Sequence, residues 1–221
     1  MTETKAPVIT FDGPSGVGKG TLSALVSEKL GWHYLDSGAL YRILGYAAEQ
    51  SQVSFDDDEG LVNLLRDLDI QFDDGAKLAG EYIESKIRTE VAGNRASLVA
   101  RHPSVRQTLL EVQRAFRQAP GLVADGRDMG TTVFADSTFK FYLTANAQER
   151  ANRRLKQLNE LGHDANIGAL FRDIEARDFR DQNRSESPLV PAKDSTVIDT
   201  SGLSIKQVLT MVMKCLPNFE I

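Results

Sequence analysis

The chain contains little cysteine, tryptophan or other aromatic residue. Of its 221 residues one is cysteine, one is tryptophan, and 7% are aromatic. A single cysteine cannot form an internal disulfide, which is compatible with a reducing compartment. We therefore expect Cys215 to be a small apolar filler in the last helix.

Long apolar runs and an excess of positive charge are also missing. No window approaches the roughly 18 uninterrupted apolar residues that a membrane-crossing helix needs, and the first seven residues lack the apolar core of a signal peptide. The 26 basic residues stand against 31 acidic ones, a formal charge of −5. We expect a cytoplasmic protein without a nucleic-acid partner, in which any phosphate-binding charge is local.

Apolar residues are abundant enough to build a substantial core. They make up 41% of the chain, and 26% of its residues are charged, as is usual for a globular α/β domain of this length. Short β-prone runs are expected to form five strands, at residues 8–11, 32–35, 122–124, 139–143 and 197–198. Helical apolar spacing follows the first two runs, starting near Lys19, stopping at Gly31 and resuming around Leu40. This alternation predicts a doubly wound α/β fold with a parallel five-stranded sheet flanked by helices.

A phosphate-binding loop follows the first predicted strand. Residues 13–19 fit the G-x-x-x-x-G-K pattern and directly precede a predicted helix. Glycines let backbone N–H groups turn around an anion, the helix start adds its positive dipole end, and the Lys19 ammonium reaches the β- and γ-phosphates of a nucleotide. Where many such loops carry the Mg²⁺-ligating hydroxyl the chain has Gly20, and the hydroxyl follows at Thr21. We therefore expect Mg²⁺ to arrive with ATP, with no dedicated protein site and Thr21 as the one possible ligand. The expected ATP-binding residues of the loop are Gly13, Pro14, Ser15, Gly16, Val17, Gly18, Lys19, Gly20 and Thr21.

Two further polar segments follow predicted strands, at the edge where open α/β sheets place their ligands. In residues 36–42, Arg42 can grip a phosphate and Ser37 can hydrogen-bond a base, although Asp36-Ser37 alone would be an ordinary helix start. In residues 125–130, Arg127 suits an acceptor phosphate, and the Asp128 carboxylate suits an exocyclic amine such as that of cytosine. A tight turn with a surface ion pair would give the second pattern too.

An arginine-rich helical region extends from Ala147 to about Arg184. Arg177, Asp181 and Arg184 are spaced to project from one helix face, as a salt-bridge ladder would be. Other arginines of the region, expected to point elsewhere, are Arg150, Arg153, Arg154, Arg172 and Arg180. This composition suits a mobile phosphate-clamping lid, although a solvated helical face is the more common meaning of such charge.

Three classes of function fit these patterns so far. One is a kinase with a small acceptor, such as CMP, AMP, UMP or shikimate. A second is a nucleotide-hydrolysing switch, which the missing Asn-Lys-x-Asp guanine motif and the arginine-rich region disfavour. The third, nucleic-acid binding, is disfavoured by the acidic balance.

The chain resembles the bacterial cytidylate kinases, from Ile9 to the last helix. The strings that carry the resemblance are residues 12–21, 35–42, 87–91, 124–131, 176–184 and 188–191. The resemblance implies transfer of the γ-phosphoryl of ATP to CMP or dCMP. Because nothing in the sequence resembles a long exposed apolar helix seam, we expect a monomer. The resemblance also implies one P-loop kinase domain over residues 1–221: a core of 1–53, 106–146 and 192–221, a monophosphate-binding insertion at 54–105, and a lid at 147–191 that closes over ATP.

The resemblance also assigns residues to each part of the reaction. It implies that Lys19, Arg127 and Arg177 stabilise the transferred group and that Arg153 contacts ATP. The implied substrate-binding residues are Ser37, Arg106, Asp128 and Arg184 for cytosine, Arg42, Arg127 and Arg177 for the acceptor phosphate, and Asp181 and Ser97 for the ribose side.

Overall fold

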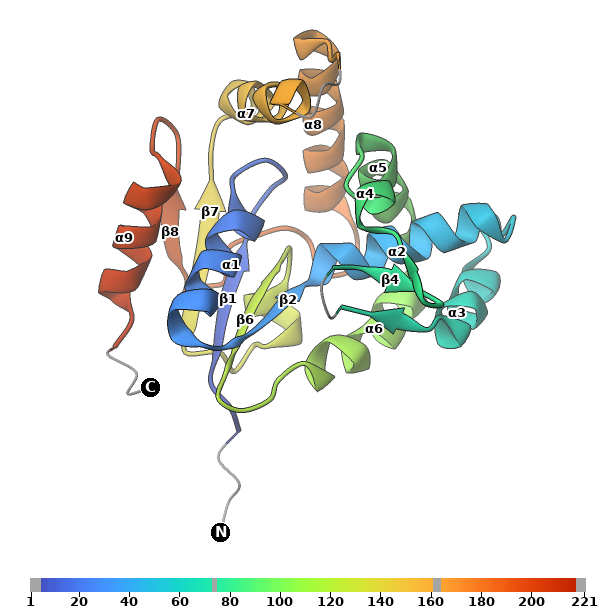
Figure 1. Cartoon of the computed structure of the whole chain (residues 1–221), viewed down its shortest axis with the longest axis horizontal. Helices are drawn as coiled ribbons and strands as arrows, with labels where there is room; N and C mark the ends of the chain where they lie inside the picture. Colours follow the sequence, from blue (N-terminus) through green and yellow to red (C-terminus); the bar gives the residue numbers. More distant parts are fainter. Residues whose placement is uncertain (1–4, 73–74, 161–163, 218–221) are drawn as a thin grey trace. The chain divides into compact units, whose positions relative to one another are not determined.

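The computed structural model of the chain describes residues 5–72, 75–160 and 164–217 (Figure 1). It divides into two compact units. The first consists of Met1–Leu35 together with Arg114–Ile221, and the second is Asp36–Gln113. Each unit has its own sheet and its own buried apolar cluster.

The first unit is built on a five-stranded sheet with the strand order β2-β6-β1-β7-β8. β1 is parallel to both β6 and β7, and β7 is parallel to β8. The strands are β1 (Val8–Asp12), β2 (His33–Asp36), β6 (Leu122–Gly126), β7 (Phe139–Thr144) and β8 (Thr196–Asp199). The five predicted strands are confirmed, and β2 begins one residue later than expected.

Helices α1 (Lys19–Leu30) and α9 (Ile205–Cys215) pack together over the main apolar cluster. Alternation along β1 directs Ile9 and Phe11 into this cluster, so Thr10 and Asp12 point to the other face of the sheet. Gly31 ends α1 in the left-handed conformation, with φ of 63°, as the sequence predicted. These contacts fix the start of α1 directly after the loop that leaves β1.

The arginine-rich region forms two packed helices, α7 (Ala147–Glu160) and α8 (Ile167–Asn183) (Figure 1). Asn166 caps α8 by accepting the backbone N–H of Ala169. α8 stops at Arg184, whose ψ of 145° is extended, so the predicted helix end is confirmed. A short π-helical turn, η1 (Met129–Val133), follows β6.

The second unit combines five helices with a small antiparallel sheet, β3-β4-β5. It extends beyond residues 54–105 to take in α2 and most of α6. Gly45 explains why α2 belongs here, because a Cβ at this position would lie 2.8 Å from the Cβ of Arg95 on α5. The elements are α2 (Ser37–Gln50), α3 (Asp58–Asp67), β3 (Ile70–Gln71), β4 (Lys77–Leu78), β5 (Glu81–Tyr82), α4 (Glu84–Ile87), α5 (Glu90–Val99) and α6 (Pro103–Ala115).

Two findings concern the surface of the molecule. Among the described residues, no helix is both long and apolar enough to cross a membrane. Cys215 is exposed at the end of α9, where its thiol donates a hydrogen bond to the carbonyl of Met211. The expectation of a buried filler was wrong, because this position lies on the solvent side of an amphipathic helix.

Candidate active site

The loop between β1 and α1 has a backbone that glycine alone adopts readily. Gly13, Gly16 and Gly18 have φ of 144°, 79° and 92°, a region that side chains disfavour. A Cβ on Gly13 would also lie 2.1 Å from the carbonyl oxygen of Leu143 on β7. The loop therefore lies tightly against the end of the sheet, and Lys19 starts the helix that follows it.

The Lys19 side chain is buried at the centre of a charged cluster. Its ammonium donates a 2.9 Å hydrogen bond to the carbonyl of Pro14. Burial and the neighbouring charge of Arg127 lower its pKa to about 7, against a smaller opposing effect of Asp125. A second guanidinium, that of Arg177 on α8, acts in the same direction. The site thus concentrates positive charge that an anion would stabilise.

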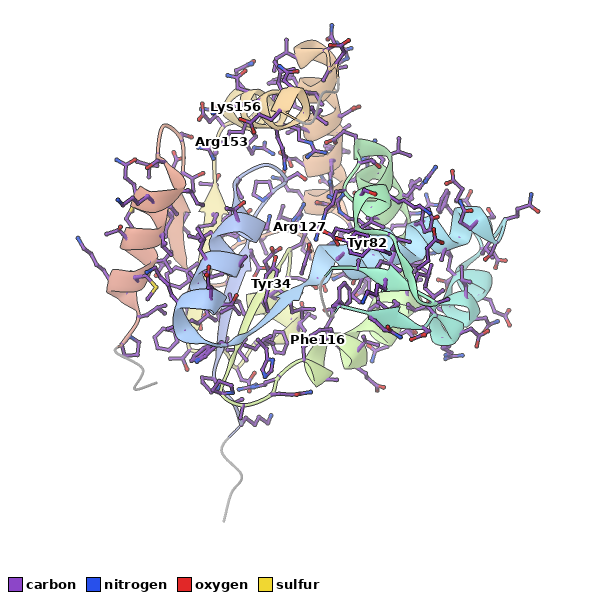
Figure 2. All side chains as sticks on the ribbon, in the orientation of Figure 1. Tyr34, Tyr82, Phe116, Arg127, Arg153 and Lys156 are labelled. Atoms are coloured by element: carbon purple, nitrogen blue, oxygen red, sulfur yellow. The ribbon has the colours of Figure 1, made fainter. Side chains whose placement is uncertain are left out.

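Arg127 links the loop to α8. Its Nε donates to Oδ2 of Asp181 at 2.9 Å, and its Nη2 donates to Oγ of Ser15 at 3.4 Å. Burial opposes the charge of Arg127, but the charge and hydrogen bond of Asp181 outweigh it and raise the pKa of the guanidinium. Burial likewise opposes the charge of Asp181, and Arg127 and Arg177 outweigh it and lower the pKa of this carboxyl. Both groups are therefore ionised at neutral pH. Figure 2 shows Arg127 at the end of β6.

The other predicted residues of this unit lie in the same cluster. Asp128 is 3% exposed, and its Oδ1 is 3.9 Å from Nη2 of Arg184. Arg177 acts electrostatically on both Lys19 and Asp181. The structure therefore gathers the loop lysine, the residues after β6, Arg177 and Asp181 on α8, and Arg184 directly after α8 around one centre. The expectation that Arg184 shares a helix face with the other two was wrong, because the backbone is already extended there.

A cavity of about 220 Å³ lies beside the same loop. Arg153, labelled in Figure 2, closes one wall. Its Nη1 donates to Oγ1 of Thr200 at 3.0 Å, and its Nη2 donates to the Thr200 carbonyl. Thr21 lines this cavity. The walls suit a flat heterocycle that is mostly apolar with a polar edge. The lining residues are Val17, Gly18, Thr21, Leu22, Leu143, Arg153, Thr200, Leu203, Ile205 and Val208.

The remaining predicted residues lie in the second unit. Ser37 is buried in the first turn of α2, after Asp36, which caps the helix by accepting the N–H of Ala39. Arg42 donates from Nη1 to the carbonyl of Ile87 at 2.9 Å.

Two more of them are on the later helices of this unit. The guanidinium of Arg106 lies over the ring of Tyr41, 5.8 Å from its centre. Ser97 donates to the carbonyl of Gly93 at 3.4 Å. Within this unit the four side chains lie on α2, α5 and α6, and those of Arg42, Arg106 and Ser97 contact their own element or a neighbouring one.

Acidic side chains near the loop have oxygen ligands to offer, but among the described residues no three metal-binding side chains gather in one group. Asp125 accepts a 2.9 Å hydrogen bond from the hydroxyl of Tyr34, and its Oδ2 would be 3.4 Å from a Cβ on Gly20. Mg²⁺ commonly binds one or two carboxylates together with substrate phosphates and water, and it does not need an all-protein cage. The donor set therefore fits a magnesium ion that a nucleotide brings with it.

A family model described as cytidylate kinase matches residues 9–218. The chain belongs to the cytidylate kinase family. It is 53% identical over 213 residues to a cytidylate kinase of Aeromonas hydrophila, which covers 94% of this chain and 93% of the relative. A cytidylate kinase of a Marinomonas species is 54% identical over 214 residues, 94% of either chain. Among solved structures, a gluconokinase from Sinorhizobium meliloti is similar over 95% of this chain and 90% of its own, with 12% identity and a TM-score of 0.48.

Sequence reasoning missed two residues that lie beside the phosphate-binding loop. Asp12, the last residue of β1, accepts the backbone N–H groups of Met129 and Gly130, each at 2.8 Å. Burial raises its pKa to about 6, against the effect of these two bonds. The signal was an acidic residue directly before the glycine loop. Arg150 is buried against that loop, so the expectation that it points elsewhere was wrong; the helix in which it lies is mostly polar, and its apolar spacing does not show the direction of this side chain.

Proposed function

We propose that this chain transfers the γ-phosphoryl of ATP to CMP or dCMP, forming CDP or dCDP in pyrimidine nucleotide metabolism. One observation carries the proposal. In a member of the cytidylate kinase family, the loop lysine and the arginine after β6 lie in one buried cluster, close enough for the charge of Arg127 to lower the pKa of Lys19. A donor phosphate held by Lys19 and an acceptor phosphate held by Arg127 would therefore meet.

On the donor side, the loop from Gly13 to Thr21 would hold the ATP phosphates. The cavity lined by Arg153 and Thr200 would take the adenine ring, because it opens beside the same loop and offers apolar walls with hydrogen-bonding groups at one side. Arg153 would thereby join the donor base to the loop, since its Nη1 also reaches the carbonyl of Val17 at 3.5 Å.

On the acceptor side, Arg127 and Arg177 would hold the monophosphate. Asp181 lies beside Arg127 and would bind the ribose, and Asp128 with Arg184 would recognise the amine edge of cytosine. The second unit would contribute Ser37 and Arg106 to the base, Arg42 to the phosphate and Ser97 to the sugar side.

The chemistry requires positioning and charge neutralisation, and no protein nucleophile. Lys19, Arg127 and Arg177 would offset the charge that spreads over the transferred group. Mg²⁺, when bound with ATP, would neutralise charge on the phosphate oxygens. Asp125 and Asp12 would hold its water shell, and the hydroxyl of Thr21, two residues after Lys19, would be a further ligand. Closure of α7 and α8 over ATP would keep water from the reacting phosphate.

We further propose that the enzyme works as a monomer in the cytoplasm, where its nucleotide substrates are made, without a nucleic-acid partner. The excess of acidic over basic residues supports the absence of a nucleic-acid partner, because a protein that binds the phosphate backbone of DNA or RNA needs a basic surface.

An acceptor panel tests the proposed reaction. ADP release is followed by a coupled assay with CMP, dCMP, UMP, AMP and shikimate, and the Lys19→Met variant serves as the inactive control. We expect CMP and dCMP to be the preferred acceptors and Lys19→Met to keep the fold while losing most of the activity. Preference for another acceptor, or hydrolysis of ATP that needs no acceptor, would overturn the proposal.

A further inference from the structure

Arg150 is the most deeply buried of the arginines on α7, with 4% of its surface exposed. Its Nε donates to the carbonyl of Ala145 at 3.0 Å, and its Nη1 donates to the carbonyl of Ser15 at 3.0 Å. Its two Nη groups also bind both carboxylate oxygens of Asp178 on α8, Nη1 at 3.1 Å. One side chain therefore joins the end of β7, the phosphate-binding loop and the second lid helix.

Ser15 is held from two sides. Its carbonyl accepts from Arg150, and its hydroxyl accepts from Arg127. Each of these arginines is paired with a carboxylate of α8, Asp178 for Arg150 and Asp181 for Arg127. Asp178 and Asp181 are about one helical turn apart on α8. Through the two guanidinium groups that they bind, α8 is therefore linked to the loop at the single residue Ser15.

The loop also packs against this pair sterically. A Cβ on Gly16 would lie 3.1 Å from the Cβ of Arg150, which shows how closely the backbone of the loop approaches α7. The pair lies beside the phosphate-binding loop, because Arg150 donates to the Ser15 carbonyl. Arg127, Asp12, Asp178 and Arg150 also act electrostatically on the hydroxyl of Tyr142. Burial, the largest effect on that hydroxyl, raises its pKa.

We propose that Arg150 and Asp178 are positioning residues, which hold the Ser15 carbonyl so that the loop keeps the conformation that binds ATP phosphates. This inference rests on the proposed function, because it concerns the donor step of that reaction. The pair would couple α8 to the loop: when α8 is in place, the Ser15 carbonyl is turned outward toward Arg150, and the backbone N–H that follows it stays available for an anion. A purely structural pair would stabilise the packing of α7 on α8 without changing the affinity for ATP.

The chain offers a matched control pair in the same unit. Arg117 donates from Nη1 to both oxygens of Asp136, and its Nε donates to the carbonyl of Ala6. This pair resembles that of Arg150 with Asp178 in its hydrogen bonds to a carboxylate and to a backbone carbonyl, although its carboxylate is more exposed. Neither Arg117 nor Asp136 contacts the phosphate-binding loop in any described interaction. Loss of either pair removes a charged hydrogen-bonded contact. The proposal predicts that loss of the Arg150–Asp178 pair weakens ATP binding and that loss of the Arg117–Asp136 pair does not.

The experiment compares Arg150→Met, Asp178→Asn and their double variant with Arg117→Met. ATP affinity is measured by calorimetry without acceptor, and kcat and the KM values for ATP and CMP are measured by the coupled assay. We expect Arg150→Met to weaken ATP binding by about tenfold to a hundredfold, the range for a charged hydrogen bond, with the KM for CMP within about twofold of wild type. The double variant should resemble the worse single variant, since both substitutions break one contact. Arg117→Met should lower the unfolding temperature and leave the affinity for ATP unchanged.

Wild-type ATP affinity in folded Arg150→Met would overturn the proposal and leave the pair a structural one. If Arg150→Met fails to fold, Asp178→Asn decides, because it removes the charge at nearly constant volume; unchanged ATP affinity in this variant would then be the contrary result. The ATP titration needs no acceptor, so it remains informative even if the acceptor panel refutes phosphoryl transfer to CMP.

Discussion

The buried position of Lys19 predicts that ATP binding weakens as pH rises above neutrality. In the absence of nucleotide the Lys19 pKa is about 7, lowered first by burial and then by Arg127. Phosphates beside the ammonium favour its charged form, so ATP binds preferentially to the enzyme in which Lys19 is protonated. Binding of ATP to the other enzyme molecules is therefore accompanied by uptake of a proton at Lys19. The affinity for ATP is therefore highest when Lys19 is charged, and it falls as the pH rises above 7.

The magnitude follows from the fraction of enzyme that carries the proton. With a pKa of about 7 this fraction is about one half at pH 7 and about one thirtieth at pH 8.5. The apparent dissociation constant rises in inverse proportion, by about fifteenfold over this range. Other groups that face Lys19 stay in one state across it: Asp12, whose pKa is about 6, is ionised, and Arg127 and Arg177 remain charged.

Calorimetry in two buffers of different ionisation enthalpy measures both affinity and proton uptake. Wild type should take up about 0.9 proton per ATP at pH 8 and about half a proton at pH 7. Lys19→Arg is the control, because a guanidinium does not lose its proton in this range. Its ATP affinity should be nearly constant from pH 7 to 8.5. Equal pH dependence in wild type and Lys19→Arg would mean that Lys19 is already charged in the empty site, and the reasoning would be wrong.

Three further substitutions probe other parts of the site. Asp128→Ala should reduce kcat/KM for CMP about tenfold more than for UMP, because the lost carboxylate favours a base with an amine; equal losses would refute this base assignment. Gly13→Ala should destabilise the fold by at least ~2 kcal/mol in urea unfolding, because its Cβ would meet the carbonyl of Leu143, whereas Gly31→Ala, with nothing within 4 Å, should cost about 1 kcal/mol. Arg153→Leu should raise the KM for ATP about tenfold and leave the KM for CMP unchanged, and a larger effect on CMP would place the adenine elsewhere.

The sequence predicted the sheet well because its strands are short apolar runs bounded by glycine and aspartate. Residues 122–124 are fully buried in β6, and Gly31 ends α1 as expected. The extent of the second unit was harder to predict, because it depends on packing between residues far apart in the chain. The structure shows that α2 packs against α5, with a close backbone approach at Gly45 and an ion pair between Glu49 and Arg95.

In the candidate site, motif spacing predicted those residues whose type is determined by the backbone conformation of the loop. The glycines at positive φ and Lys19 at the helix start fall into this class. Side-chain direction within the arginine-rich helices could not be predicted from spacing alone. Arg150 was expected to point elsewhere but lies against the loop, since its direction is set by its partner Asp178 on another helix.

The site proposed to bind phosphates is nevertheless rich in carboxylates, which is explained by the cost of burying unpaired charge. A buried guanidinium or ammonium without a partner would strongly destabilise the empty protein. Here the cations Lys19, Arg127, Arg150 and Arg184 lie beside the carboxylates Asp125, Asp181, Asp178 and Asp128 respectively. Bound phosphates would replace some of these carboxylates as the ion-pair partners of the cations. The released carboxylates could then serve the uncharged or hydrated groups of the ligands: a ribose hydroxyl, an exocyclic amine, or the water shell of Mg²⁺. The same acidic residues would thus stabilise the empty fold and supply the polar contacts by which the filled site distinguishes its nucleotides.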